Sequence, residues 1–455
     1  MTVSSGDTDL AVVILAAGSS TRFHSSLVKV LHPLAGRPMI VYSVDLARSL
    51  GVQQPVLVVG NDADRVREYL GDRVAYVEQS EQLGTGHAVM QAHPALAGRS
   101  RMVLVLYGDM PLQRAETLRR LVALHRAGHA PVTMLTVLSD DSMGFGRILR
   151  DPIDHRILGI VEEAVATPEQ LAIRELNTGA YCFQAEWLWQ HLPRIRLRPK
   201  GEYYLTDLIE MAVSEGHPVQ ALTIDDVTEV VGINTRAHLA WAEAILRHRI
   251  NERWMLAGVT LVDPDTTYIE ADVTIGQDTL ILPGTHLKGQ TVIGRDCIIG
   301  PHTWIQDATL GAGCVVRFSV VERATLEDDV DVGPFAHLRQ GAHLAQGVHM
   351  GNFGEVKNAY LGSGTKMGHF SYLGDAVVGR DVNIGAGTIT CNYDGQNKHQ
   401  TLIGDGAFIG SDTMLVAPVE IGERSKTGAG SVVTHDVPPD SVVYGVPARR
   451  RPSEE

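Results

Sequence analysis

A short motif near the N-terminus combines residue types that bind phosphate groups. Residues Leu15–Arg22 read LAAGSSTR, they follow the apolar run Ala11–Ala16, and Lys29 comes shortly after Arg22. A Gly/Ser turn at the end of a strand presents backbone N–H groups to a phosphate, and the two cations would add positive charge. The spacing fits neither a Walker A loop nor the Gly-x-Gly-x-x-Gly motif. An ordinary strand-to-helix turn remains the alternative.

A second candidate follows another apolar run, Met102–Tyr107. Asp109 stands there in the sequence Tyr107-Gly108-Asp109-Met110-Pro111. A carboxylate beside a glycine can approach a divalent metal ion bound to phosphates, although an isolated Gly-Asp also caps turns and helices. Further polar clusters, each turn-like on its own, are Gln79, Gly84-Thr85-Gly86, Gly144–Arg147, Val161-Glu162, Asn177–Gly179 and Gly232–Asn234.

One histidine of the second half stands near residues suited to acid–base chemistry. His369 follows Gly368, and Arg339, Glu355 and Lys357 precede it by 12 to 30 residues. In a repeating coil these residues would stack near the histidine. A histidine that is oriented by a carboxylate and flanked by cations can act as general base on a phosphorylated substrate. The alternative is one more packing or surface histidine among the 19 of the chain.

The first half alternates apolar runs with helix-like segments. The runs are Ala11–Ala16, Pro55–Gly60, Val74–Val77 and Met102–Tyr107, and the helix-like segments between them include Pro38–Leu50 and Ala63–Leu70. Continuous apolar strands separated by helices predict a parallel sheet that is covered on both faces. Ligands of such sheets bind at the carboxyl ends of the strands. The motifs after Ala16 and Tyr107 are therefore well placed.

Aliphatic residues recur every six positions after Gly258. The first series is Ile275, Ile281, Leu287, Ile293, Ile299 and Ile305; after a slip the frame resumes with Val332, Leu338, Leu344, Met350, Val356, Leu361, Met367, Leu373, Val378 and Ile384, and it ends with Ile403, Ile409, Leu415, Ile421, Thr427 and Val433. This period is typical of a parallel β-helix, in which three hexapeptides form a triangular coil. A Gly-rich loop would not hold one frame so long. The segment Cys391–Thr401 interrupts the frame and predicts a projecting loop.

A helical pattern separates the two halves. Over Thr235–Leu256, the apolar residues Leu239, Ala242, Ile245 and Leu246 share one face. We expect one connecting helix ending near Gly258, and hence three parts: residues 1–236, a linker at 237–257, and residues 258–455.

Composition limits the classes of partner and compartment. The chain of 455 residues has a net charge of −14, which argues against nucleic acid or an anionic membrane as its main partner. No apolar run is long enough for a membrane span, and the N-terminus lacks a signal-peptide core. The four cysteines are widely separated, which favours free thiols in a reducing compartment. We therefore expect a cytoplasmic location.

Taken together, the motifs resemble one family. LAAG…TR…K, Glu81–Ala88 (EQLGTGHA), YGD and ELNTG are similar to nucleotide-sugar pyrophosphorylases, whereas Gly351–Ala359, Gly368–Ala376 and Asn383–Gly395 are similar to hexapeptide acetyltransferases. From about Ala11 to Pro447, the chain resembles the bifunctional N-acetylglucosamine-1-phosphate uridyltransferase/glucosamine-1-phosphate N-acetyltransferases of bacterial cell-wall precursor synthesis. The resemblance implies a Rossmann-like α/β nucleotidyltransferase domain joined by a long helix to a left-handed β-helix.

For the first half, the resemblance implies uridylyl transfer from UTP to N-acetylglucosamine-1-phosphate, which gives UDP-N-acetylglucosamine and pyrophosphate. Arg22 and Lys29 would stabilise charge on the phosphates, and Asp109 and Asn234 would bind Mg²⁺. The nucleotide sugar would contact Leu15, Ala16, Ala17, Gly18, Lys29, Gln79, Gly84, Thr85, Tyr107, Gly108, Asp109, Gly146, Glu162, Asn177 and Asn234. Such chemistry needs positioning and charge neutralisation rather than a covalent nucleophile.

For the second half, the resemblance implies acetylation of glucosamine-1-phosphate by acetyl-CoA. His369 would be the base, and Glu355 would assist it. The sugar phosphate would contact Arg339, Lys357, Tyr372, Asn383 and Lys398. Acetyl-CoA would contact Ala386, Asn392, Tyr393, Ser411 and Ala429. The resemblance also implies a homotrimer whose neighbouring chains complete this site, with small molecules as the other partners.

The sequence departs from the family pattern at a few positions. The family usually has Gly at Ser20, Pro at Val28, Lys-Asp at Ala164-Val165 and a basic residue at Gly445. Ser20 and Val28 motivate one rival interpretation, an acetyltransferase with a degenerate N-terminal domain. A second rival is a non-enzymatic regulatory scaffold. Retention of Arg22, Lys29, Asp109 and Asn234 opposes the first, and His369 with Glu355 and Lys357 opposes the second.

Overall fold

The computed structural model describes residues 9–18, 21–60, 63–199 and 201–450. The chain forms two compact units, Met1–Ile245 and Leu246–Glu455, and the division falls inside helix α8 (Arg236–Leu256). The bounds of this helix differ by one residue from the predicted segment Thr235–Leu256. Within the described ranges, no helix is both long and apolar enough to cross a membrane.

The first unit is built on a sheet with the strand order β11-β7-β10-β6-β1-β4-β5. Its strands are β1 (Leu10–Ala16), β4 (Val56–Val59), β5 (Ala75–Glu78), β6 (Met102–Tyr107), β7 (Val132–Leu138), β10 (Glu175–Gln184) and β11 (Val219–Ile224). The sheet is mixed rather than wholly parallel, because β10 runs antiparallel to both β6 and β7. The chain reaches β10 through the hairpin of β8 (Arg147–Arg150) and β9 (Ile157–Val161), so no crossover helix imposes parallel pairing.

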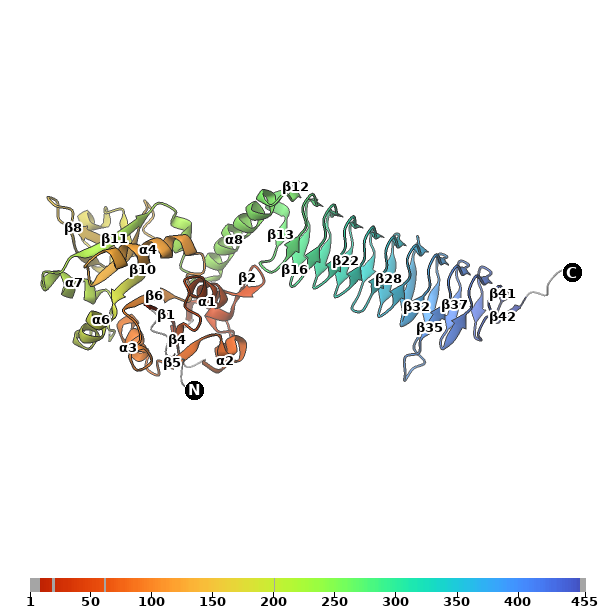
Figure 1. Cartoon of the computed structure of the whole chain (residues 1–455), viewed down its shortest axis with the longest axis horizontal. Helices are drawn as coiled ribbons and strands as arrows, with labels where there is room; N and C mark the ends of the chain where they lie inside the picture. Colours follow the sequence, from red (N-terminus) through yellow and green to blue (C-terminus); the bar gives the residue numbers. More distant parts are fainter. Residues whose placement is uncertain (1–8, 19–20, 61–62, 200, 451–455) are drawn as a thin grey trace. The chain divides into compact units, whose positions relative to one another are not determined.

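Helices cover both faces of this sheet, as its continuous apolar strands predicted (Figure 1). On one face, α3 (Thr85–Leu96), α6 (Ala185–His191) and α7 (Asp207–Ser214) contribute to a core with alternate strand residues such as Val13 and Leu15. The intervening strand residues are buried as well. Helices α1 (Met39–Ser49) and α4 (Ala115–Ala127) contact β1, β7 and β10, and α2 (Ala63–Leu70) follows β4.

The second unit is a left-handed β-helix of short parallel strands, which Figure 1 shows as successive coils. From β12 to β39, neighbouring strands of one sheet are three strands apart in the chain, so three sheets form. They begin at β12 (Thr260–Leu261), β13 (Tyr268–Ile269) and β14 (Thr274–Ile275). The first sheet ends in the antiparallel pair β41 (Val442–Gly445) and β42 (Ala448–Arg450). This is the triangular coil that the six-residue period predicted.

Every aliphatic residue of the predicted frame is buried. Across the slip in the frame, Leu310, Val316, Val321 and Leu326 take the inward positions, and three of the steps there are five residues long. A five-residue step lacks one corner residue, but the next aliphatic side chain still points inward. The triangular coil therefore continues through the slip in the six-residue frame. Thr390 also takes an inward position, where its hydroxyl donates to the carbonyl of Gly374 at 3.0 Å.

Candidate active sites

Four predicted residues converge at the carboxyl edge of the first sheet. The ammonium of Lys29 donates to Asp109 Oδ2 at 2.6 Å and to Asn234 Oδ1 at 2.8 Å. Arg22 donates to the same Asn234 oxygen at 3.3 Å. Since these residues come from three distant parts of the sequence, only the fold brings them together. The cluster presents two cations and a carboxylate at one point, as phosphate and metal binding require.

The strands of the sheet place this cluster. Asp109 follows β6, the N–H of Gly108 donates to the carbonyl of Leu15 in β1 at 2.9 Å, and Ile233 donates to the carbonyl of Asp109 at 2.9 Å. A Cβ at Gly108 would lie 2.7 Å from Ile40 Cδ1, so a larger residue would clash with the buried Ile40 side chain. The bond from Ile233 ties the segment that carries Asn234 to the Asp109 turn.

A cavity of about 970 Å³ opens beside the cluster. Seven predicted residues line it: Thr85, Tyr107, Asp109, Gly146, Glu162, Asn177 and Asn234. Burial raises the pKa of the Tyr107 hydroxyl and of the Glu162 carboxyl. Asn177 is buried and accepts from Tyr181 Oη at 2.9 Å, which fixes its orientation in the wall. The volume is that of a typical small-molecule site.

Other predicted residues shape the loops around the cavity rather than line it. Gln79 is buried and donates to the carbonyl of Gly84 at 3.0 Å, and Gln82 donates to the carbonyl of Ala17 at 2.8 Å. Gly84 has φ +92°, and a Cβ there would lie 2.8 Å from the Tyr203 carbonyl, so glycine is required. Gly18 faces open space. The expected effect of Ser20 lies outside the described residues.

Sequence reasoning missed part of the cavity wall. Arg198, Tyr204, Thr206 and Asp207 line it, and Arg198 donates to Asp207 Oδ1 at 2.6 Å. Thr206 lies 3.5 Å from Glu162 Oε1. In the sequence, only the polar and aromatic run after residue 200 could have indicated these wall residues. It interrupts the apolar pattern just before α7.

The buried carboxyl of Glu162 leads to a stability prediction. Burial raises its pKa, whereas the hydrogen bond from Thr206 lowers it; the net direction is upward. A carboxyl whose pKa is raised on folding stabilises the fold below its unfolded pKa, and this contribution is lost as pH rises. Glu162→Gln should therefore raise the melting temperature at pH 7 but not at pH 4, while weakening uridylyl transfer. Calorimetry at both pH values checks this, and no stabilisation at pH 7 would contradict it.

In the β-helix, Lys357 lies on a strand of one of the three sheets, Arg339 directly follows a strand of that sheet, and Lys398 lies in the loop beyond it. The strands of that sheet include β25 (His337–Leu338), β28 (Gly354–Lys357), β31 (Ser371–Gly374) and β34 (Ile389–Cys391). Arg339 donates to Glu355 Oε1 at 2.7 Å. The ammonium of Lys398 and, more weakly, the guanidinium of Arg339 lower the pKa of Lys357. Three neighbouring cations with one carboxylate form a net positive site suited to a phosphate.

His369 lies at the corner of the coil before β31, and its side chain is exposed. Among the described residues it forms no hydrogen bond or ion pair. The structure therefore does not bring His369 together with Glu355 in one chain, because Glu355 pairs in register with Tyr372 and its carboxylate is held by Arg339. The imidazole remains available to a substrate.

Three residues assigned to acetyl-CoA stack at one corner of successive coils. Ala386, Ser411 and Ala429 each stand two residues after an inward-facing side chain, Asp412 donates to the carbonyl of Ala386 at 2.6 Å, and Gly430 donates to that of Ser411 at 2.8 Å. Asn383 lies in β33 (Asn383–Ile384), on a different sheet from Arg339. Arg449 pairs in register with Tyr444 beside Gly445 and is exposed.

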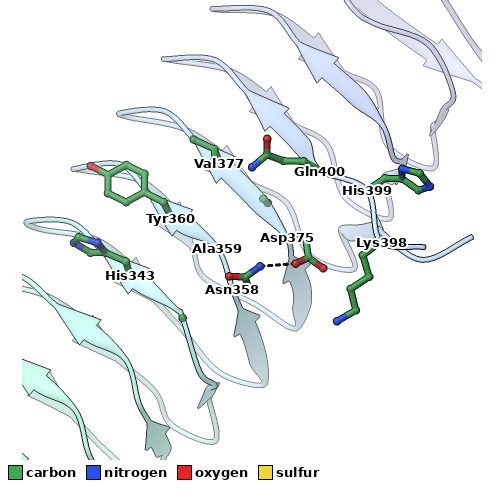
Figure 2. A pocket seen from close by; sticks show the side chains of 11 residues that line it. His343, Asn358, Ala359, Tyr360, Asp375, Val377, Lys398, His399 and Gln400 are labelled. Carbon is green, nitrogen blue, oxygen red and sulfur yellow. Dashed lines mark hydrogen bonds between the residues drawn. The ribbon is translucent and has the colours of Figure 1, made fainter. Parts of the chain in front are cut away.

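The interruption of the frame forms a projecting loop between β34 and β35 (Thr401–Ile403), as predicted (Figure 1). It carries three predicted residues, Asn392, Tyr393 and Lys398, and Tyr393 and Lys398 form an antiparallel bridge. At its base lies a cavity of about 410 Å³, shown in Figure 2, to which Lys398 and Asp375 contribute.

Comparison with known proteins covers both units. The model of the MobA-like NTP transferase domain matches residues 12–197, and that of the bacterial transferase hexapeptide (six repeats) matches residues 272–307 and 400–435. Curated relatives described as "Bifunctional protein GlmU" include those of Pelobacter propionicus, 50% identical over 439 residues, and Trichlorobacter lovleyi, 49% identical over 438 residues. Each alignment covers 95% of both chains.

Proposed function

Because the chain belongs to the GlmU family of bifunctional enzymes, we propose that its two units carry one transferase site each, built from the residues described above. The enzyme acetylates glucosamine-1-phosphate with acetyl-CoA and couples N-acetylglucosamine-1-phosphate to UTP, which gives UDP-N-acetylglucosamine and pyrophosphate. The observation that carries the site assignment is the convergence of Lys29, Asp109 and Asn234 beside a cavity of about 970 Å³.

In the first unit, uridylyl transfer requires charge neutralisation around the reacting phosphates. Arg22 and Lys29 would bind phosphate oxygens, with Lys29 held in place by Asp109 and Asn234 at 2.6 and 2.8 Å. The cavity walls, including Glu162 and Asn177, would hold the sugar. The sugar-phosphate oxygen then attacks the α-phosphorus in line, and pyrophosphate leaves.

Asp109 and Asn234 also fit a magnesium ion. Their oxygens approach one cationic centre, the ammonium of Lys29, so a carboxylate and an amide oxygen already converge on a point. Mg²⁺ prefers such oxygen ligands, and it usually takes only one or two from the protein because phosphates and waters complete its shell. Bound there, the ion would neutralise phosphate charge; Asp109 and Asn234 would hold it.

In the second unit, Arg339, Lys357 and Lys398 would bind the phosphate of glucosamine-1-phosphate, and Tyr372 lies on the same sheet. His369 would take a proton from the amine as it attacks the thioester carbonyl carbon, and coenzyme A leaves as the thiol. Glu355 would act by holding Arg339 rather than by orienting His369 within the same chain.

The positions of His369 and Lys357 support a trimer with shared sites. Lys357 pairs in register with Gly374, five residues beyond His369, so His369 is not the residue that stacks on Lys357 in the next coil. We expect chains carrying His369→Ala and chains carrying Lys357→Ala to regain acetyl transfer when they are mixed before assembly. The acetyl-CoA-dependent release of thiol measures this recovery, and no recovery would place both residues in one chain's site.

The two activities should also separate when the chain is cut. The backbone N–H of Ala35 donates to Glu243 at 2.8 Å, so a fragment ending at residue 245 keeps a contact that one ending at 236 loses. We expect residues 1–245 to retain uridylyl transfer, and residues 246–455 to sediment as a trimer with acetyl transfer. An active monomer of the second fragment would contradict the shared site.

A paired assay on the full-length enzyme tests the whole proposal. It measures pyrophosphate from UTP plus N-acetylglucosamine-1-phosphate, with and without Mg²⁺, and thiol from acetyl-CoA plus glucosamine-1-phosphate. Absence of only the first activity would favour the rival interpretation, an acetyltransferase with a degenerate N-terminal domain.

The free thiols of Cys182, Cys297, Cys314 and Cys391 support a cytoplasmic location, which we include in the proposal.

A further inference from the structure

Asp375 connects the projecting loop to the coil beneath it. Its Oδ2 accepts from Asn392 Nδ2 at 2.5 Å, and Asn392 opens the loop. Its Oδ1 accepts from Asn358 Nδ2 at 2.6 Å, the bond drawn in Figure 2, and Asn358 lies one coil earlier. Both oxygens of one carboxylate are therefore engaged by amide donors on opposite sides.

The backbone of Asp375 makes the same connection. Its N–H donates to the carbonyl of Lys357 at 3.2 Å, and its carbonyl accepts from the N–H of Thr401 at 3.1 Å. Asn392 and Thr401 are the two ends of the loop, so one residue holds both ends. It also joins them to Lys357, a member of the basic cluster.

The loop between those ends is internally braced. Asp394 Oδ1 accepts from the N–H groups of Gln396 and Asn397 at 2.8 and 2.7 Å, and Asp394 Oδ2 pairs with His399 Nε2 at 2.7 Å. These bonds hold the pKa of the Asp394 carboxyl well below its usual range. A braced loop moves as a unit, so the anchoring of its ends decides where Lys398 lies.

Anchoring is needed because Lys398 is held near like charges. The ammonium groups of Lys398 and Lys357 repel each other, as the lowered pKa of Lys357 indicates, so we expect an unanchored loop to move Lys398 away when no anion is bound. We propose that Asp375 is a positioning residue of the acetyl-transfer site, which fixes Lys398 against Lys357 by holding Asn358 with one oxygen and Asn392 with the other. This inference rests on the proposed role of these lysines in binding the sugar phosphate.

The competing interpretation is that Asp375 is an ordinary corner residue of the β-helix without a role in acetyl transfer. Aspartates at several corners of the β-helix have positive φ, among them Asp375 at +49° and Asp381 at +55°. Asp and Asn tolerate this conformation because their short polar side chains bond locally. Asp381 is therefore a matched control, since it lies at another corner and does not bond the projecting loop.

An exchange of side chains between positions 358 and 375 tests the inference. In Asp375→Asn, the new amide has one acceptor oxygen and an NH₂ group that faces the NH₂ of a neighbouring asparagine. In Asn358→Asp, two carboxylates would meet at 2.6 Å. The double variant Asn358→Asp/Asp375→Asn restores both hydrogen bonds with the same net charge, because the amide at position 375 then donates to the carboxylate at position 358 and accepts from Asn392.

We expect Asp375→Asn to raise the KM for glucosamine-1-phosphate about tenfold with a smaller effect on kcat, and Asp381→Asn to leave both unchanged. The double variant should recover most of the loss. A wild-type KM in Asp375→Asn, or a double variant no better than the single, would overturn the inference. Uridylyl transfer reports on correct folding of each variant.

Hydrogen exchange of the amides of residues 392–401 provides a readout that needs no activity. Exchange should be faster in Asp375→Asn than in the wild type, and the double variant should slow it again. Unchanged exchange would overturn the inference. If the wild-type enzyme does not use glucosamine-1-phosphate but exchange still responds, the proposed substrate is wrong and the anchoring role of Asp375 stands.

Discussion

Replacement of His369 by alanine is expected to lower acetyl transfer by about 10²–10⁴-fold, because a general base in the rate-limiting proton transfer contributes on this scale. The side chain is exposed and forms no hydrogen bond with the described residues, so its loss should not disturb the coil. Uridylyl transfer should stay at its wild-type rate, since the first unit holds that site. Both rates are measured on the same preparation.

His435→Ala is the matched control for this variant. His435 is also an exposed histidine of the β-helix, and among the described residues its Nδ1 forms a hydrogen bond only with the neighbouring Thr434, at 3.0 Å. Because an imidazolium cannot accept the amine proton, the pH profile of acetyl transfer should differ between the wild type and His369→Ala. An active His369→Ala variant, or a pH profile that the substitution does not change, would exclude His369 as the base.

Asp109→Asn is expected to lower uridylyl transfer at least about 10²-fold, with acetyl transfer unchanged. The substitution keeps the size of the side chain but removes its charge. It should therefore weaken the proposed magnesium site and release Lys29, whose 2.6 Å contact with Asp109 is largely shielded from solvent. Pyrophosphate release at saturating UTP, titrated with Mg²⁺, measures both consequences.

Asp225→Asn controls for a general effect of removing one carboxylate from the first unit, because Asp225 is exposed and lies outside the cavity. A higher Mg²⁺ requirement in Asp109→Asn but not in Asp225→Asn would support metal binding at Asp109. Near wild-type uridylyl transfer in Asp109→Asn would show that neither the metal nor Lys29 depends on this carboxylate.

Local patterns in the sequence were sufficient for the architecture. The six-residue period predicted the β-helix because nearly every inward position of a triangular coil holds an aliphatic side chain. The apolar strands with intervening helices predicted a covered sheet, and the turns after Ala16 and Tyr107 predicted ligand groups at its carboxyl edge. The antiparallel direction of β10 was not predicted, because strand direction depends on how the chain connects the strands and not on the composition of the strand.

Only the tertiary structure decided which predicted groups touch. Lys29, Asp109 and Asn234 meet because the three segments that carry them converge in the folded chain, and their spacing in sequence carries no such information. Periodicity placed Glu355 about one coil before His369, but it did not show where each residue lies along its coil. In the structure, Glu355 pairs in register with Tyr372, and the Glu355 carboxylate accepts a hydrogen bond from Arg339. Asp375 gave no sequence signal, since its role comes from contacts between separate coils. A repeat determines which way a side chain points, whereas contacts between coils depend on the packed chain.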